Sequence, residues 1–220
     1  LHKILEQVDF TATRSSSSLK SIINSELNKA GLDLEFTDAI EETIFRVLNI
    51  PLGGPLESLC LRDIKIADRI TELNFDLPIT NKDSPISTSD LIKIFENEPN
   101  CRFFNQYKSK LKKLNIYSRG YLTGAIDLIF ADNENHDIAK WWVLDWKSNW
   151  IGNKENEVIS CGPANYGEKE MNNQMLEHHY PLQANIYLVA LHRYLRWRLP
   201  NYNASKNLGG YIYIFLRGIP

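Results

Sequence analysis

Two apolar segments in the second half of the chain contain ionisable residues at positions that a buried strand tolerates poorly. Residues 121–130 and 140–148 both alternate with a period of two, which predicts two β-strands of similar length. Asp127 lies in the first strand, and Asp145 and Lys147 lie in the second. A charged group in an apolar strand costs free energy unless it is paired or binds a metal. The pattern therefore predicts a sheet that carries a functional cluster.

The same period assigns faces to the two strands. In the first strand, Asp127 is expected on the face of Thr123, Ala125 and Ile129, opposite an apolar face formed by Leu122, Ile126, Leu128 and Phe130. In the second strand, Asp145 and Lys147 share a face, opposite Trp142, Leu144 and Trp146. We expect the strands to pair as an antiparallel hairpin, which would bring the two aspartates together.

The first 60 residues are predicted to be a helical segment. Apolar residues recur at helical spacing from Leu19 to Leu27, after serines that can cap the amino end, and Gly31 provides a stop. A second helix before Pro51 has one apolar stripe, formed by Ile40, Ile44, Val47 and Leu48. We expect these helices to pack on the core or on a partner.

Residues 64–220 are predicted to form an α/β core. We expect a strand at 70–77, a helix after the capping residues 87–90, a long loop at 149–169 and a buried last strand at 211–216. A helix ending before Pro200 should bury one stripe, Leu182, Ile186, Val189, Ala190, Tyr194 and Leu195. This order predicts an α/β fold with a mixed central sheet flanked by helices, in one domain of residues 1–220.

Asp127, Asp145 and Lys147 suit metal-assisted hydrolysis of a phosphodiester. Two carboxylates from adjacent strands can converge on one Mg²⁺, which prefers oxygen ligands. The ammonium of Lys147 lies two residues after Asp145 and could stabilise negative charge on the reacting phosphate. An Asp followed 18 residues later by Asp-x-Lys also occurs by chance. A salt bridge between Asp145 and Lys147 with no further role is therefore the competing interpretation.

The residues around this cluster resemble the RecB nuclease domain, a family of the PD-(D/E)xK class. The resemblance rests on Gly-Ala-Ile-Asp-Leu at 124–128, on Leu-Asp-Trp-Lys-Ser-Asn-Trp-Ile-Gly at 144–152, and on Gln183 and Tyr187, four residues apart. It continues to residues 209–218 and implies a restriction-endonuclease-like core. Trp146 stands where better-known members have tyrosine, but only its backbone carbonyl would face a metal.

The resemblance also implies roles for individual residues. The implied metal ligands are His2, Asp127, Asp145 and the carbonyl of Trp146. The implied catalytic residues are Asp127, Asp145, Lys147, Glu72, Gln183 and Tyr187. On residue type alone, His2 would be an exposed terminal histidine, Glu72 a surface carboxylate and Tyr187 a buried tyrosine beside an amide.

A metal-dependent deoxyribonuclease of the exodeoxyribonuclease V type is the activity that the resemblance implies. Mg²⁺ is the expected cofactor, with Mn²⁺ as a substitute and Ca²⁺ binding without supporting much activity. The implied setting is a helicase–nuclease in double-strand break repair and recombination. Its expected partners are single- and double-stranded DNA, RecC-like and RecD-like subunits, and RecA recombinase.

A longer polypeptide is expected around this chain. Leu1 is followed at once by a helical pattern, and the 220 residues contain no Gly-x-x-x-x-Gly-Lys-Ser/Thr motif for ATP. There is also no apolar stretch of the roughly 20 residues needed to cross a bilayer, and no secretory signal. We therefore expect the fragment to be cytoplasmic, without a membrane partner, and any motor to lie elsewhere in the polypeptide.

Net charge and cysteine spacing limit which nucleic-acid-binding and metal-binding functions are possible. A net charge of −2 and a pI near 6.2 argue against a protein that coats nucleic acid, but allow a local DNA channel. Four lysines form a basic run, which is either a solvated face or a contact to the DNA backbone. They are Lys108, Lys110, Lys112 and Lys113. The cysteines are too far apart for a zinc or iron–sulfur site and are expected to be ordinary thiols: Cys60, Cys101 and Cys161.

Two rival functions remain open from the sequence. A nuclease-like fold could serve as a docking module for a recombinase or a partner subunit, although intact Asp127, Asp145 and Lys147 argue against this. A free-standing restriction-type or junction-resolving endonuclease would be expected to self-associate through a large apolar patch. Cleavage assays distinguish the docking module from a nuclease. The oligomeric state distinguishes a free-standing endonuclease from a module of a longer polypeptide.

Overall fold

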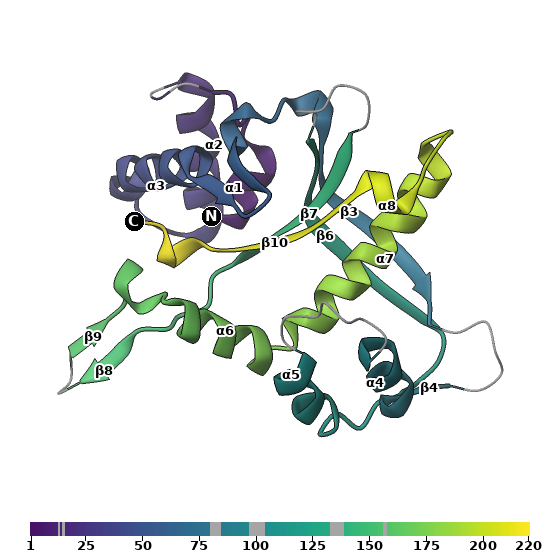
Figure 1. The fold of residues 1–220 in the computed structure, drawn as a ribbon. Coiled ribbons are helices and arrows are strands. Elements are labelled where there is room, and N and C mark those ends of the chain that lie inside the picture. The colour runs from purple at the N-terminus through teal and green to yellow at the C-terminus, as the bar shows by residue number, and fades with distance from the viewer. Residues whose placement is uncertain (13, 15, 80–84, 97–103, 133–138, 156–157) are drawn as a thin grey trace.

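A four-stranded mixed sheet forms the centre of the computed structural model, which describes residues 1–12, 14, 16–79, 85–96, 104–132, 139–155 and 158–220 (Figure 1). The strand order is β10-β7-β6-β3. β6 (Tyr121–Asp132) is antiparallel to both β3 (Arg69–Pro78) and β7 (Lys140–Lys147). β10 (Leu208–Phe215) runs parallel to β7. The predicted mixed sheet and the predicted hairpin are both confirmed.

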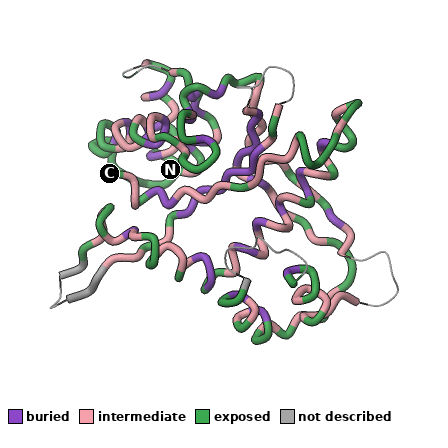
Figure 2. The backbone as a smooth tube through the Cα atoms, in the orientation of Figure 1, coloured by how far each residue is buried: buried purple, intermediate pink, exposed green. Residues whose placement is uncertain are grey.

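Helices cover the two faces of this sheet. The apolar residues of α1 (His2–Gln7), α2 (Ser17–Ala30) and α3 (Thr37–Asn49) share a buried cluster with β7 side chains, namely Trp142, Leu144 and Trp146. On the other side, α7 (Tyr180–Arg198) packs on a second buried cluster, which includes Ile126, Ile129 and Val143. Figure 2 shows the buried residues concentrated along these central strands. The α/β class with flanking helices is confirmed, whereas a single domain for the whole chain stays a prediction.

Helix α2 begins and ends where its sequence predicts. The side-chain oxygen of Ser16 accepts a hydrogen bond from the Leu19 amide at 3.2 Å, which satisfies one of the free amides of the first turn. Gly31 ends the helix in the left-handed region, at φ 67°. Leu19, Ile23 and Leu27 form its buried stripe. Burying each of these side chains contributes about 1.5–3 kcal/mol.

Shorter elements surround this framework. The other helices are α4 (Thr88–Glu96), α5 (Phe104–Leu111), α6 (Glu168–Glu177) and α8 (Ala204–Asn207). Three two-stranded hairpins or bridges are β1 (Pro51–Gly53) with β2 (Leu56–Cys60), β4 (Ile86–Ser87) with β5 (Tyr117–Ser118), and β8 (Asn153–Glu155) with β9 (Val158–Ser160). Single 3₁₀ turns are η1 (Leu34–Phe36), η2 (Leu61–Asp63), η3 (Ile66–Asp68), η4 (Pro163–Asn165) and η5 (Leu216–Gly218).

Two predicted segments contain strands that the sequence pattern did not indicate. Residues 51–60 form the β1–β2 hairpin, so the first 60 residues are not wholly helical. Its turn uses Gly53 and Gly54, both at positive φ, which glycine adopts without steric cost. The predicted loop at 149–169 contains the β8–β9 hairpin and the start of α6.

The predicted faces of β6 are wrong at one point. Leu128 and Phe130 face the helices α1–α3, but Leu122 and Ile126 face α7 together with Ile129. The alternation shifts at Asp127, where pairing with β7 has already stopped and pairing with β3 skips one position. The residue of β3 at that skipped position is Glu72, whose φ of 51° is left-handed and strained for a non-glycine residue.

Two further burial predictions are corrected. Val189 of α7 is 49% exposed, because the helix turns Ala184, Tyr187 and Leu191 toward the sheet instead. β10 is a half-buried edge strand and not a fully buried one, since among the described strands it pairs only with β7.

The remaining predictions concern surface features. Lys108 pairs with Glu96 and Lys110 with Glu177, which favours the solvated interpretation of the basic run. Cys60 and Cys161 are free thiols, and Cys101 lies outside the described residues. Within the described part of the chain, every helix is too short or too polar to span a membrane.

Candidate active site

Strands β6 and β7 separate at the level of the two predicted aspartates. Their pairing runs from Asp132 and Lys140 to Leu128 and Leu144, and stops there. Beyond that point, Oδ2 of Asp127 accepts a hydrogen bond from the Trp146 amide at 2.9 Å. A side-chain carboxylate thus takes the place of the backbone acceptor, and it fixes the Trp146 peptide group beside Asp127.

The carbonyl of this Trp146 residue faces His2. His2 Nε2 donates a hydrogen bond to the Trp146 carbonyl oxygen at 2.9 Å, across 144 positions of sequence. Helix α1 is anchored by buried Ile4 and Leu5, and Arg69 of β3 donates to the carbonyl of Val8 at 2.6 Å. The packing of α1 therefore brings a residue near the chain start to the predicted metal-binding carbonyl.

Asp145 and Lys147 are buried together on the opposite face of β7 from Trp146. They are 4% and 8% exposed, and Asp145 Oδ2 lies 2.6 Å from Lys147 Nζ. This oxygen nevertheless accepts no well-directed hydrogen bond from any described residue. It is therefore a buried acceptor with unused capacity, which is what a cation ligand or a protonated state would use.

The Lys147 ammonium is enclosed by residues of α7 and β10. Its Nζ donates to Gln183 Oε1 at 2.8 Å and lies 3.9 Å and 4.9 Å from the ring centres of Tyr180 and Tyr213. These two rings are stacked on each other, with centroids 5.3 Å apart. Each ring face attracts the cation, so Lys147 is held in one direction.

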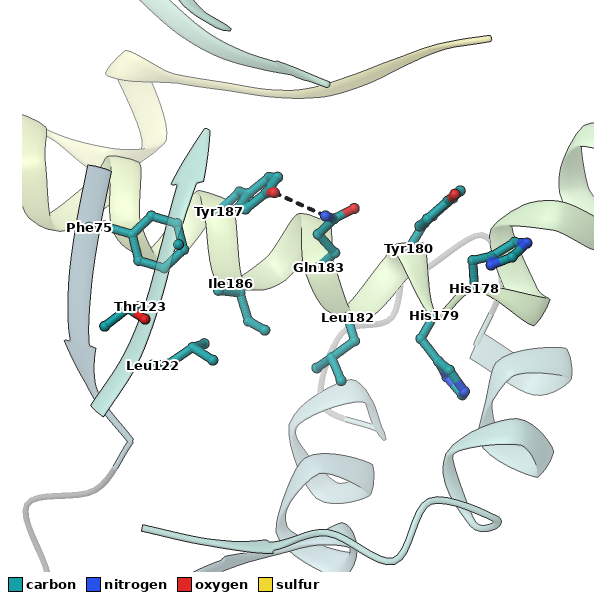
Figure 3. A pocket seen from close by; sticks show the side chains of 11 residues that line it. Phe75, Leu122, Thr123, His178, His179, Tyr180, Leu182, Gln183, Ile186 and Tyr187 are labelled. Carbon is teal, nitrogen blue, oxygen red and sulfur yellow. Dashed lines mark hydrogen bonds between the residues drawn. The ribbon is translucent and has the colours of Figure 1, made fainter. Parts of the chain in front are cut away.

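Gln183 and Tyr187 lie on this same side of α7, as their spacing predicts. Gln183 Nε2 donates to the Tyr187 hydroxyl at 2.9 Å, which fixes the orientation of the amide (Figure 3). The Tyr213 hydroxyl donates to the same Gln183 Oε1 that receives Lys147, at 3.1 Å. The amide oxygen thus bridges a lysine and a tyrosine, and both predicted residues belong to the Lys147 environment.

Burial controls the electrostatics of this cluster. It raises the pKa of the Asp145 carboxyl to about 6, and the positive charge of Lys147 offsets only part of this effect. Burial, reinforced by the negative charges of Asp145 and Asp127, also raises the pKa of Tyr187. The tyrosine hydroxyls are therefore neutral hydrogen-bond groups, and Asp145 is the group whose charge responds to pH or to a bound cation.

Glu72 lies at the edge of the cluster. It occupies the β3 position across from Asp127, but its Oε1 is 4.0 Å from Lys3 Nζ and its side chain is 37% exposed. The strained backbone at this residue is the kind that persists where the surroundings impose it. Its catalytic role stays a prediction.

The donor set fits a hard divalent cation. His2, Asp127, Asp145 and the Trp146 carbonyl would offer two carboxylates, a carbonyl and an imidazole, and the unused oxygen of Asp145 is consistent with this set. Among the described residues, no three His, Cys, Asp or Glu side chains already form a metal cluster. Binding would therefore require the ligands to move closer together.

Comparisons with known proteins show what the chain is similar to. No family model matches the chain. RecB subunits of the RecBCD enzyme are 30% identical to it in Mycolicibacterium smegmatis over 228 residues, in Mycobacterium tuberculosis over 231 and in Escherichia coli over 220. The alignments take in 100% of this chain. The chain is homologous to a segment of RecB.

This RecB segment is only a part of the relatives it matches. The chain spans 20% of the length of the two mycobacterial RecB subunits and 16% of the Escherichia coli one. The homology agrees with the resemblance seen in residues 124–128 and 144–152.

Two residues of the site were missed by the sequence reasoning. Tyr180 precedes Gln183 by three residues and therefore lies on the same helical face. Tyr213 is the register partner of Asp145 in the parallel pairing of β10 with β7. The helical spacing could have identified Tyr180, whereas Tyr213 required the strand register.

Proposed function

We propose that this chain is the nuclease module of a RecBCD-type helicase–nuclease, and that it hydrolyses DNA phosphodiester bonds with Mg²⁺. The observation that carries this proposal is the buried Asp145–Lys147 pair beside Asp127, where two strands separate. Burying such ions costs roughly several kcal/mol each. A purely structural sheet gains little from them, whereas phosphoryl chemistry uses both charges.

The residues of the chain would divide the work between holding a cation and facing the phosphate. His2, Asp127, Asp145 and the Trp146 carbonyl would hold Mg²⁺, which when bound supplies a Lewis acid and an acidified water. Gln183, Tyr180 and Tyr213 aim the Lys147 ammonium at Asp145, and so at the oxygens of a phosphate bound there. In a buried site this charge is weakly screened and stabilises an anionic transition state.

The homology to RecB supports the wider setting. We propose DNA as the substrate, RecC-like and RecD-like subunits as partners, and double-strand break repair and recombination as the process. A RecA recombinase partner stays a prediction.

Cleavage of linear and circular single-stranded DNA in Mg²⁺ tests the proposal, with Asp145→Ala beside Asp76→Ala. Asp76 is an exposed carboxylate of β3 and serves as the matched control. We expect the wild type and Asp76→Ala to degrade DNA and Asp145→Ala to lose activity by about 10²-fold or more. Absence of DNA cleavage by all three proteins would instead support the docking module.

A further inference from the structure

One side of α7, next to the side that packs on the sheet, is partly open. Leu182, Ile186, Val189 and Arg193 follow one another along one side of the helix. Val189 is 49% exposed and Arg193 is exposed, whereas Tyr187 and Leu191 pack on the sheet. Contiguous apolar surface on a protein often marks a binding site.

Two adjoining hollows run along this face. The first, of about 340 Å³, lies between the start of α7 and the ends of β3 and β6, and Figure 3 shows its walls. The second, of about 400 Å³, extends to Val189 and Arg193. Leu122, Leu182 and Ile186 line both hollows. We call the two together the α7 trough.

The α7 trough begins at the candidate active site. Gln183 and Tyr187 line its first hollow, and Gln183 also accepts the hydrogen bond from Lys147. Figure 3 shows Gln183 and Tyr187 directed to one side of α7, with Leu182 and Ile186 on another. In a nucleotide the base and the phosphate share one sugar, so a phosphate at Lys147 would place neighbouring bases at the trough.

The chemistry of the lining suits bases better than phosphates. The walls are mostly apolar, and no carboxylate is among the described residues that line either hollow. Phe75 lies edge to face with Tyr187, at 5.9 Å and 76°. Bases stack on aromatic rings whatever their sequence. At the far end, Arg193 has no ion-pair partner among the described residues and could bind a phosphate.

Gly124 sets the width of the first hollow. A Cβ at this position would lie 2.7 Å from Cζ of Phe75, so the ring rests directly on the β6 backbone. A side chain there would displace the ring, which lines the hollow. The glycine therefore keeps the space open.

We infer that the α7 trough holds unpaired bases of the DNA strand next to the scissile phosphate, with Arg193 at a backbone phosphate farther along. The inference rests on the proposed nuclease function, because it takes Lys147 as the position of the reacting phosphate. Bases in a duplex are already stacked and paired, so only a single strand can enter. An apolar peptide is the alternative occupant, and it predicts no dependence on bases.

Binding of the full chain to three oligonucleotides tests the inference: an oligodeoxythymidylate, the same backbone with abasic residues, and a duplex. Fluorescence anisotropy in chelator measures affinity, and a separate assay in Mg²⁺ measures cleavage. We expect the wild type to bind the thymidylate at least about tenfold more tightly than the abasic strand, the scale of one stacked base. Phe75→Leu and Gly124→Ala should both lose most of this preference while binding the abasic strand unchanged.

Two further variants sharpen the result. Trp197→Ala removes a 75% exposed aromatic side chain of α7 outside the trough and should keep the full preference for bases. Arg193→Gln should reduce the slope of log affinity against log salt by about 0.7, the value of one lost phosphate contact on a single strand.

The outcomes separate the two proposals. A wild type that cleaves DNA in Mg²⁺ but binds thymidylate and abasic strands equally would overturn the inference that the α7 trough holds bases. The nuclease proposal would remain intact. A wild type that binds and cleaves no DNA would contradict the nuclease proposal itself. If Trp197→Ala loses as much of the preference for bases as Phe75→Leu does, the inference about the α7 trough is also overturned.

Discussion

Alternate residues of strand β7 form two faces, one apolar and one charged. Trp142, Leu144 and Trp146 enter an apolar cluster with the helices α1–α3. Asp145 and Lys147 are as deeply buried on the other face, where Gln183, Tyr180 and Tyr213 surround the lysine. The first face stabilises the fold through burial. The second tolerates charge because polar and aromatic groups are already in place around it.

The comparison shows that burial alone does not distinguish core from site. Trp146 and Asp145 are 5% and 4% exposed, yet only the Asp145 carboxylate keeps an oxygen without a well-directed donor among the described residues. Trp142 Nε1 on the apolar face is also buried without a hydrogen-bond partner among the described residues, so the buried charges of Asp145 and Lys147 are the feature that separates the faces. Substitutions on each face should therefore affect different properties.

The largest expected effect follows from Lys147→Ala. Its ammonium is aimed at Asp145, and we expect turnover to fall by about 10²-fold or more while DNA affinity changes far less. Lys140→Ala, at the exposed start of the same strand, is the matched control. A Lys147→Ala protein that loses stability and activity in proportion would assign the pair to structure instead.

The second largest expected effect is a pH dependence of the free energy of unfolding, caused by Asp145. Its pKa is about 6 in the folded chain and near 3.8 when unfolded, so the folded state holds the proton more tightly. The free energy of unfolding should therefore fall as pH rises from about 4 to about 6, by on the order of 2 kcal/mol. Denaturant titrations without metal should show a flatter profile for Asp145→Asn. An unchanged profile would mean that another group titrates.

His2→Ala should weaken metal binding by about tenfold and leave the melting temperature nearly unchanged. The reason is that His2 contacts the Trp146 carbonyl from helix α1, while Ile4 and Leu5 hold that helix in place. Calorimetric titration with Mg²⁺ or Mn²⁺ measures this, with Lys3→Ala as the control. If both variants bind the metal with equal affinity, His2 is not a metal ligand.

The smallest expected effect concerns the rings around Lys147. Tyr180→Leu should lower kcat about fivefold with little change in KM, since a partly buried cation–π contact contributes about 1 kcal/mol. Tyr180→Phe keeps the ring and loses only the hydrogen bond to Asn149, so it should retain most activity. Equal losses in both variants would assign the effect to the hydroxyl.

Local sequence signals predicted the elements that depend on local physics. Ser16 and Gly31 bound α2, and the period of two placed Asp145 and Lys147 on one face of β7. The antiparallel hairpin of β6 and β7 also followed from the pattern. Each of these is set within one segment or between two segments that are neighbours in the sequence.

Features set by distant parts of the chain could not be read in the same way. The contact of His2 with Trp146 spans 144 positions and was accessible only through the family resemblance. The shift of faces at Asp127 depends on where two different strand pairings stop. The exposure of Val189 depends on which stripe of α7 the sheet selects. In the last two cases tertiary packing overrides the local period.

The metal requirement of cleavage tests the account most directly, because it asks whether the polar face of β7 is an active site at all. The full chain is incubated with linear single-stranded DNA in Mg²⁺, in Mn²⁺, in Ca²⁺ and in excess chelator. We predict cleavage in Mg²⁺ and Mn²⁺, little in Ca²⁺, whose looser coordination misplaces the attacking water, and none in chelator. Cleavage that proceeds undiminished in excess chelator would contradict the account.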